Sequence, residues 1–365
     1  MRKEISYQLS RIKVFLSIIA VIVLIFGMQQ AQSILVPVIL AIFISSIVAY
    51  PMEWLISKRI PKVVALTIVV ILVLGFIALI GTVLGNSINN FAQKTGSYEK
   101  NLTEMYNRTF LNYNAKDLED ATRIAGVTAQ DIFEKIASYI SPATLMEWSK
   151  LIMGSIQNIF KNFFLIIIAM IFMLIETGSF KHKLDLISVE NPEARISVNK
   201  FLSSIRKYIA FKTLISLGTG IIITLWVSIL GLDFPVLWGM TAFILNFIPT
   251  IGSIIAAVPA VLIALVQLGP GYAGLVALGY LVTNITIGNL LEPRIMGYSL
   301  GLSTIVVFIS LLFWGWVFGF TGMLLAVPLT MTVKIALESS QRSKNIALLM
   351  SSNREIMKRK IKDNE

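Results

Sequence analysis

Long apolar runs separated by short polar turns most strongly constrain what this chain can fold into. A helix needs about 20 residues to cross a bilayer. Runs near that length cover 12–28, 34–50, 62–87, 156–176, 209–232 and 271–291, and two longer ones cover 234–268 and 303–335. Only 14% of the residues are charged, whereas soluble domains have about 25%. We therefore predict an all-α polytopic membrane protein with about eight helical segments.

The basic residues are concentrated at the ends of the chain and in particular turns, and the net charge is +11. They gather before the first run, at Lys58–Lys62, along Lys181–Lys207 and in the C-terminal tail. Such clusters are typical of cytoplasmic loops facing anionic lipid. The pattern predicts that both termini are cytoplasmic, and it favours contact with membrane lipid over nucleic acid. A second apolar run directly follows the first, which favours a retained helix over a cleaved signal peptide.

Enzyme chemistry has little support in this sequence. The chain has no cysteine and a single histidine, His182. Thiolate nucleophiles and histidine-rich metal sites are therefore excluded. Gly297–Gly301 matches the G-x-S-x-G pattern, but that motif needs a preceding strand and a histidine base, and His182 lies in a different basic loop. We expect no catalytic residues, no metal and no cofactor.

Four parts are expected along the chain. Transmembrane helices occupy 1–86, a small helical extracytoplasmic module 87–155, a transport core with broken helices 156–338 and a basic cytoplasmic tail 339–365. In the module, Ser141-Pro142 is typical of a helix start, and 132–140 carries apolar residues at helical spacing. That apolar face packs on a neighbour, either in the same chain or in another subunit. We expect a homo-oligomer.

The two longest runs are interrupted by residues that break helices. Asn246, Pro249, Thr250 and Gly252 interrupt the run 234–268, and a glycine-rich stretch, 315–322, interrupts the run 303–335. A similar phrase follows each break, GSIIAAVP at 252–259 and GMLLAVP at 322–328, and a Trp-Gly pair precedes each. Each run is either one kinked span or a re-entrant hairpin. Hairpins would enter from opposite faces, as in transporters with inverted repeats.

A charged break follows the run 271–291. Residues 288–304 combine Asn, Glu, Pro and Arg, and one charge at the bilayer centre costs about 2.5–3.5 kcal/mol on insertion scales. Pro293 between Glu292 and Arg294 predicts an extended backbone there. Either both charges pair with other segments or they end a helix at a watery loop. We favour the first, because Asn246, Asn284 and Asn289 provide further polar groups within the apolar runs.

The remaining polar groups within the runs are hydroxyls and amides. This set comprises Asn246, Thr250, Ser253, Asn284, Thr286 and Asn289. Such groups suit a neutral polyol, whereas ion-coupled pumps more often carry several buried carboxylates, and Glu292 is the one good candidate here. The composition therefore favours a small polar organic solute.

The chain resembles the autoinducer-2 exporter family of bacterial membrane proteins. The resemblance covers nearly the whole chain, and the segments that carry it are 237–259 and 288–338, with LVPVILAIFIS at 35–45. It implies a transporter of the bacterial cytoplasmic (inner) membrane that exports autoinducer-2, a small sugar-like signal used in quorum sensing. Other members of this family are associated with monovalent cation/proton antiport. The resemblance also implies that the breaks at 249–252 and 292–294 form the functional core.

We therefore expect a secondary transporter that exports autoinducer-2. The expected solute-binding residues are Asn246, Thr250, Asn284 and Asn289, and the expected gating or coupling residues are Pro249, Gly252, Glu292, Pro293 and Arg294. The first alternative is a monovalent cation/proton antiporter in which Glu292 titrates. The second is a membrane scaffold whose external module recruits partners.

Overall fold

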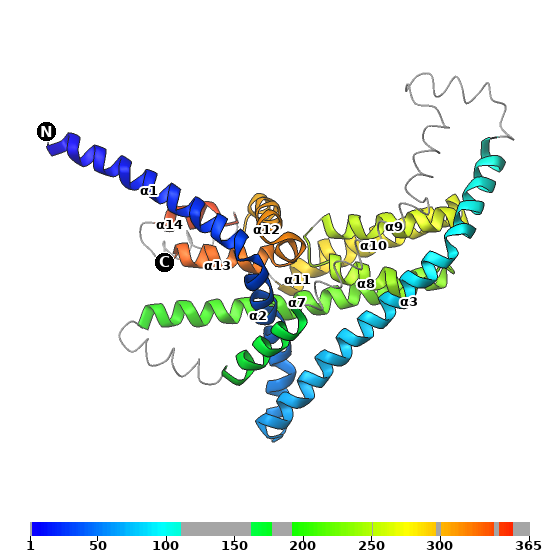
Figure 1. The fold of residues 1–365 in the computed structure, drawn as a ribbon, viewed down its shortest axis with the longest axis horizontal. Coiled ribbons are helices and arrows are strands. Elements are labelled where there is room, and N and C mark those ends of the chain that lie inside the picture. Colours follow the sequence, from blue (N-terminus) through cyan, green and yellow to red (C-terminus); the bar gives the residue numbers. More distant parts are fainter. Residues whose placement is uncertain are drawn as a thin grey trace. The chain divides into compact units, whose positions relative to one another are not determined.

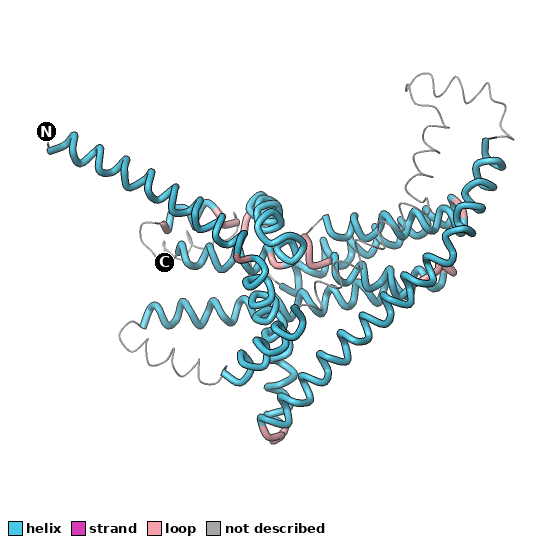
Figure 2. The backbone as a smooth tube through the Cα atoms, viewed as in Figure 1, coloured by secondary structure: helices cyan, strands magenta, loops and turns pink. Residues whose placement is uncertain are grey.

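The computed structural model describes residues 2–110, 162–176, 192–249, 251–296, 301–338 and 343–352. In these ranges the regular structure is helical, apart from one isolated antiparallel bridge between Leu302 and Ser351 (Figures 1 and 2). Within the same ranges, six helices are long and apolar enough to cross a bilayer. The predicted all-α polytopic class is confirmed.

The helices follow the predicted apolar runs. In chain order they are α1 (Arg2–Gln30), α2 (Gln32–Ser57), α3 (Lys62–Phe110), a helix at Asn162–Glu176, α7 (Pro192–Ile229), α8 (Pro235–Leu245), α9 (Ile251–Leu268), α10 (Pro270–Thr283), the π-helix η1 (Asn284–Leu291), α11 (Glu292–Met296), α12 (Thr304–Leu324), α13 (Ala326–Glu338) and α14 (Lys344–Leu349).

The chain divides into two compact units. Unit 1 comprises Met1–Trp54, Phe163–Ala210 and Tyr298–Glu365, and unit 2 comprises Leu55–Asn162 and Phe211–Gly297. The main apolar core of unit 2 joins α8, α9 and α10 with the second half of α7, and small residues of α9 (Ala256, Ala260 and Ala264) are fully buried in it. Small side chains let these helices approach closely.

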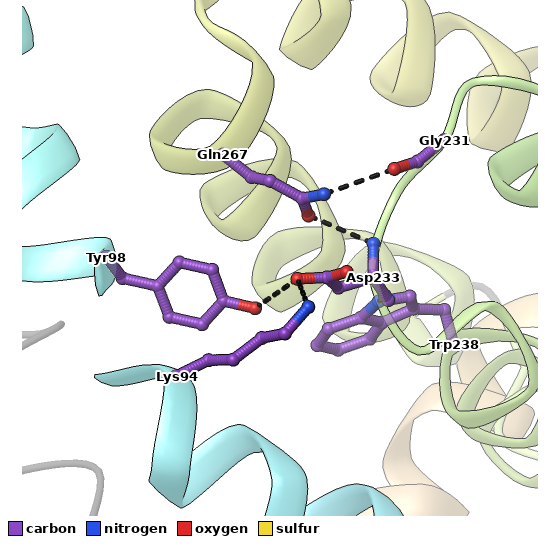
Figure 3. Close-up of polar contacts among 6 residues, drawn as sticks. All are labelled: Lys94, Tyr98, Gly231, Asp233, Trp238 and Gln267. Atoms are coloured by element: carbon purple, nitrogen blue, oxygen red, sulfur yellow. Dashed lines mark hydrogen bonds and ion pairs between the residues drawn. The ribbon is translucent and has the colours of Figure 1, made fainter. Parts of the chain in front are cut away.

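In unit 2, α8 and α9 form a helical hairpin. At its open end the Gln267 side chain accepts a hydrogen bond from the Asp233 backbone N–H at 2.9 Å and donates one to the Gly231 carbonyl at 3.1 Å (Figure 3). At its tip, Gly252 packs so closely on the Leu245 carbonyl that a Cβ would collide with it. Residues 34 positions apart therefore meet, and the chain reverses direction between the two helices.

In unit 1, α12 and α13 form a second hairpin. The Trp314 indole N–H donates to the Thr330 hydroxyl at 2.9 Å across 16 residues, a separation of about 24 Å in a straight helix. The reversal lies near Gly319, whose φ of 61° interrupts α12. At the open end, Lys334 Nζ donates to the Gly301 carbonyl at 2.7 Å. The structure therefore assigns hairpins to both long runs, where the sequence left single spans open.

The two hairpins share part of the repeat seen in the sequence. Gly252 and Gly322 have matching positions, because each presses against a backbone carbonyl on the other side of a chain reversal, that of Leu245 or that of Trp314. The Trp-Gly pairs do not match: Trp238 bonds the Asp233 carbonyl at the open end, whereas Trp314 packs at the tip. The phrase after each break therefore corresponds to a structural repeat, and the tryptophan before it does not.

The extension of α3 beyond its apolar run contacts the open end of the first hairpin. Lys94 Nζ lies 2.7 Å from Asp233 Oδ2, and the Tyr98 hydroxyl donates to the same oxygen at 2.9 Å (Figure 3). Burial, and then the neighbouring carboxylate, raise the pKa of Tyr98 above its ordinary value. Asp233, which follows the apolar run 209–232, is therefore held in this cluster. The helical signals predicted at 132–142 lie outside the described residues.

Candidate solute-binding site

Two stretches of helix in unit 2 each carry a row of small or polar residues at helical spacing. One is α7, and the other is the continuous helix formed by α10, η1 and α11. On α7 the row is Lys212, Ser216 and Thr219, all buried. On α10, η1 and α11 it is Tyr280, Asn284, Gly288 and Glu292, each four residues from the next. Residues at this spacing lie on one side of a helix. We call these two rows, which run in opposite directions, the polar stripe.

An ion pair forms one end of the polar stripe. Lys212 Nζ donates to Glu292 Oε1 at 2.6 Å, and the two side chains are only 4% and 21% exposed. A buried charge is unfavourable unless it is paired, and removing one partner of such a pair is strongly destabilising. Lys212 and Glu292 therefore hold each other in place where α7 meets α11.

A small pocket lies further along the stripe, and its cavity volume of about 10 Å³ is close to that needed for one water molecule. It is lined by residues from α7, α8, α9, α10 and η1, namely Thr219, Ile223, Ala242, Asn246, Ser253, Tyr280, Thr283, Asn284 and Gly288. Six of these nine side chains carry a hydroxyl or an amide, and none of them is charged. Such a lining can hydrogen-bond a solute through uncharged groups.

The tip of the first hairpin supplies one wall of this pocket. Asn246, which ends α8, is buried and donates from Nδ2 to the Ser216 hydroxyl at 2.9 Å. This hydrogen bond ties the tip to α7 and leaves the Asn246 carbonyl oxygen available as an acceptor. On the facing side, η1 is wound as a π-helix, a form that often occurs at functional sites.

The structure brings together some of the predicted site residues and separates others. Asn246, Asn284 and Ser253 line one pocket, whereas Asn289 and Thr286 are exposed. Pro249 is half-buried, Gly252 is buried in the hairpin tip, and Thr250 lies outside the described residues.

The charged break behaves differently from the prediction in one respect. Glu292 pairs with another segment, but Pro293 and Arg294 are exposed, and no ion pair to Arg294 is seen among the described residues. The expected extended backbone at Pro293 is wrong. Glu292 has helical φ and ψ of −56° and −49°, and helix continues from η1 through α11 to Met296. The π-helix offers a reason. Its last hydrogen bond runs from the Glu292 N–H to the Ile287 carbonyl, five residues back. Pro293, which has no N–H to donate, comes directly after that bond.

Two residues of this site were missed by reasoning from the sequence. Lys212 lies only a few residues inside the run 209–232. A lysine so close to the end of a run is usually interpreted as a residue at the membrane surface. A charge inside an apolar run is nevertheless a signal of function. Tyr280 gave no signal, because a tyrosine in an apolar helix usually reflects packing. The part of the chain that the structure describes contains no group of three side chains suited to a metal ion.

The fold and this site together define a polytopic α-helical membrane protein with a polar cavity between broken helices, the architecture of a secondary transporter. The family described as AI-2E family transporter matches residues 16–342. The chain is 34% identical over 343 residues to the AI-2 transport protein TqsA of Escherichia coli K12, covering 94% of this chain and 96% of that protein.

Two further relatives are similar over the same extent. A putative transport protein of Haemophilus influenzae is 33% identical, with 93% of this chain and 96% of the relative covered. The putative transport protein YhhT of Escherichia coli K12 is 32% identical, with 93% and 95% covered. The chain belongs to the AI-2E transporter family, and its role is transport.

Proposed function

We propose that this protein exports a small, neutral, polar signalling molecule, autoinducer-2, and that the pocket on the polar stripe binds it after widening from its present volume of about 10 Å³. The observation that carries the proposal is the lining of the pocket, whose polar groups are hydroxyls and amides without a charge. Two of the side chains expected to bind solute, Asn246 and Asn284, face this space together. The name of the similar TqsA protein, an AI-2 transport protein, supports the choice of solute.

The Lys212–Glu292 pair is the gate in this proposal. It lies at the end of the polar stripe, about 10 Å along α7 from Thr219. Separating the pair would open the stripe beyond the pocket, and the hairpin tip at Pro249 and Gly252 would move with the pocket wall. Arg294 is exposed, so the proposed gate consists of Lys212 and Glu292.

The proposed location is the bacterial cytoplasmic membrane, with both termini in the cytoplasm. From Lys62 to Lys94, α3 rises about 48 Å, which exceeds the hydrocarbon thickness of about 30 Å. The basic turn before Lys62 is therefore cytoplasmic in this proposal, and the Lys94–Asp233 cluster is outside. The chain contains no cysteine, so impermeant maleimide labelling of single cysteines placed at Lys58 and Gly271 tests this orientation directly. We expect only the Gly271→Cys protein to react in intact cells, and the reverse pattern would contradict the orientation.

The full-length protein reconstituted in vesicles tests the proposed solute. Flux of autoinducer-2 is measured in parallel with sodium and proton flux, in the wild type and in Glu292→Gln. We expect autoinducer-2 flux without cation flux, and a loss of that flux in the variant when equal amounts of folded protein are reconstituted. Vesicles that move no autoinducer-2 would contradict the proposal.

A second function, monovalent cation/proton antiport, is favoured by one observation. Glu292 is a half-buried carboxylate held by a buried lysine, and carboxylates within membrane spans often serve as proton relays in transporters. This alternative predicts sodium or potassium flux exchanged for protons, with no movement of autoinducer-2 and with loss of exchange in Glu292→Gln.

A further inference from the structure

Tyr280 lines the pocket, and its hydroxyl has no hydrogen-bond partner among the described residues. Tyr280 is 5% exposed and packs in the core of unit 2 among residues of α7, α8 and α9. Among the described residues, its oxygen is the buried side-chain atom that no hydrogen bond satisfies. Burying an unpaired hydroxyl is unfavourable, and phenylalanine would fill the same space without that cost. An unpaired group of this kind in a native core calls for an occupant beside it.

The surroundings of Tyr280 indicate the chemistry of that occupant. The Thr219 hydroxyl already donates to the Ile215 carbonyl at 3.0 Å, and the Asn246 amide already donates to Ser216. These two groups therefore offer oxygens as acceptors, while the Tyr280 hydroxyl can donate or accept. A hydroxyl group, which also donates and accepts, matches this set of hydrogen-bonding groups.

The same lining disfavours an inorganic cation. Sodium and potassium are bound best by several oxygens that include carboxylates or backbone carbonyls. The lining of this pocket includes no carboxylate. The nearby acid Glu292 is bonded to Lys212 at 2.6 Å and is not among the residues that line the pocket.

We propose that Tyr280 hydrogen-bonds a hydroxyl group of the solute and thereby selects neutral polyhydroxylated molecules over cations. This inference rests on the proposed function in one point, that the pocket is the solute site. It assigns to Tyr280 a specificity role that the phenol ring alone, as a packing element, would not have. A site built to bond a hydroxyl discriminates strongly against an analogue that lacks it.

Tyr280→Phe tests the inference in vesicles containing the full chain, with autoinducer-2 and its single-deoxy analogues as probes. We expect the variant to fold with an unfolding temperature equal to or above that of the wild type, because it removes an unpaired group. The KM for autoinducer-2 should rise about tenfold, the loss of one good hydrogen bond. One deoxy analogue should show the same KM in both proteins.

The control is Tyr272→Phe, an exposed tyrosine on the same helix, which should change neither KM nor discrimination. An unchanged KM in Tyr280→Phe, with every analogue still discriminated as in the wild type, would overturn the inference and assign the hydroxyl to a bound water.

A failure of the proposed function is distinguishable from a failure of this inference. If the wild type moves no autoinducer-2, the thermal shift caused by glycerol, erythritol and ribose is compared in the two proteins. Stabilisation of the wild type that is lost in Tyr280→Phe would keep the inference while the solute changes. Equal shifts, or none in either protein, would overturn the inference as well.

Discussion

Lys212 and Glu292 form the pair of residues on which the proposed gate depends. The pair is buried at its lysine end and partly open at its carboxylate end, so each charge needs the other more than an exposed pair would. Replacing both partners by uncharged groups of similar size is often tolerated, whereas removing one leaves a buried charge behind.

We therefore expect Lys212→Met to be more harmful than the double variant Lys212→Met/Glu292→Gln. The single change should destabilise the protein by about 2–4 kcal/mol, less than a fully buried pair because Glu292 retains some solvent. Unfolding in detergent, followed by tryptophan fluorescence, measures the difference. Arg294→Gln is the matched control two residues from Glu292 and should leave stability within about 0.5 kcal/mol of the wild type. Equal losses in the single and double variants would contradict a coupled pair.

The residues of this site differ in how far sequence alone could find them. Asn246 and Asn284 were predicted, because amides are conspicuous in apolar runs. Asn289 was predicted with them but is exposed. Which side chains of η1 point toward the pocket depends on its π-helical winding, and hydropathy does not reveal that winding. Lys212 and Tyr280 could not be found from the sequence, because their roles depend on contacts with segments distant in sequence and no local pattern indicates those contacts.

At the scale of elements, two hairpins replace what hydropathy presents as two long runs. The breaks themselves were predictable from Asn, Pro and Gly, but chain reversal was not. α8 has 11 residues, about 16 Å of helix, which is close to half of the roughly 30 Å hydrocarbon thickness. An arm of that length suits a re-entrant segment whose tip ends within the bilayer. At Pro293 the prediction was wrong in the other direction. The effect of proline on the preceding residue predicted an extended backbone, but the helix continues through this position.

The tip glycine of the first hairpin gives a prediction at this scale. We expect Gly252→Ala to lower the unfolding temperature, because its Cβ would collide with the Leu245 carbonyl and separate the arms. A cost of about 1–3 kcal/mol follows from overpacking at a rigid contact. Gly274→Ala is the matched control, since a Cβ there meets nothing within 4 Å and alanine favours helix. Equal effects of the two substitutions, measured in the same detergent, would contradict the tight tip.

At the scale of the whole molecule, unit 2 contains the pocket, the ion pair and the first hairpin, while unit 1 contains the second hairpin. The extracytoplasmic module 87–155 stays a proposal, with α3 helical as far as Phe110 and the rest outside the described residues. Homo-oligomer formation likewise stays a prediction. In the proposed mechanism, the wall formed by the first hairpin and α7 both contacts the solute and moves during transport.

The most direct test of this account is autoinducer-2 flux through vesicles containing Asn284→Ala or Asn289→Ala. Both residues lie on η1, but Asn284 lines the pocket and Asn289 is exposed. We expect Asn284→Ala to lower the flux about 2- to 10-fold at subsaturating solute, the loss of one hydrogen bond, and Asn289→Ala to transport as the wild type does. Equal flux in both variants, or a loss confined to Asn289→Ala, would contradict the assignment of this pocket as the solute site.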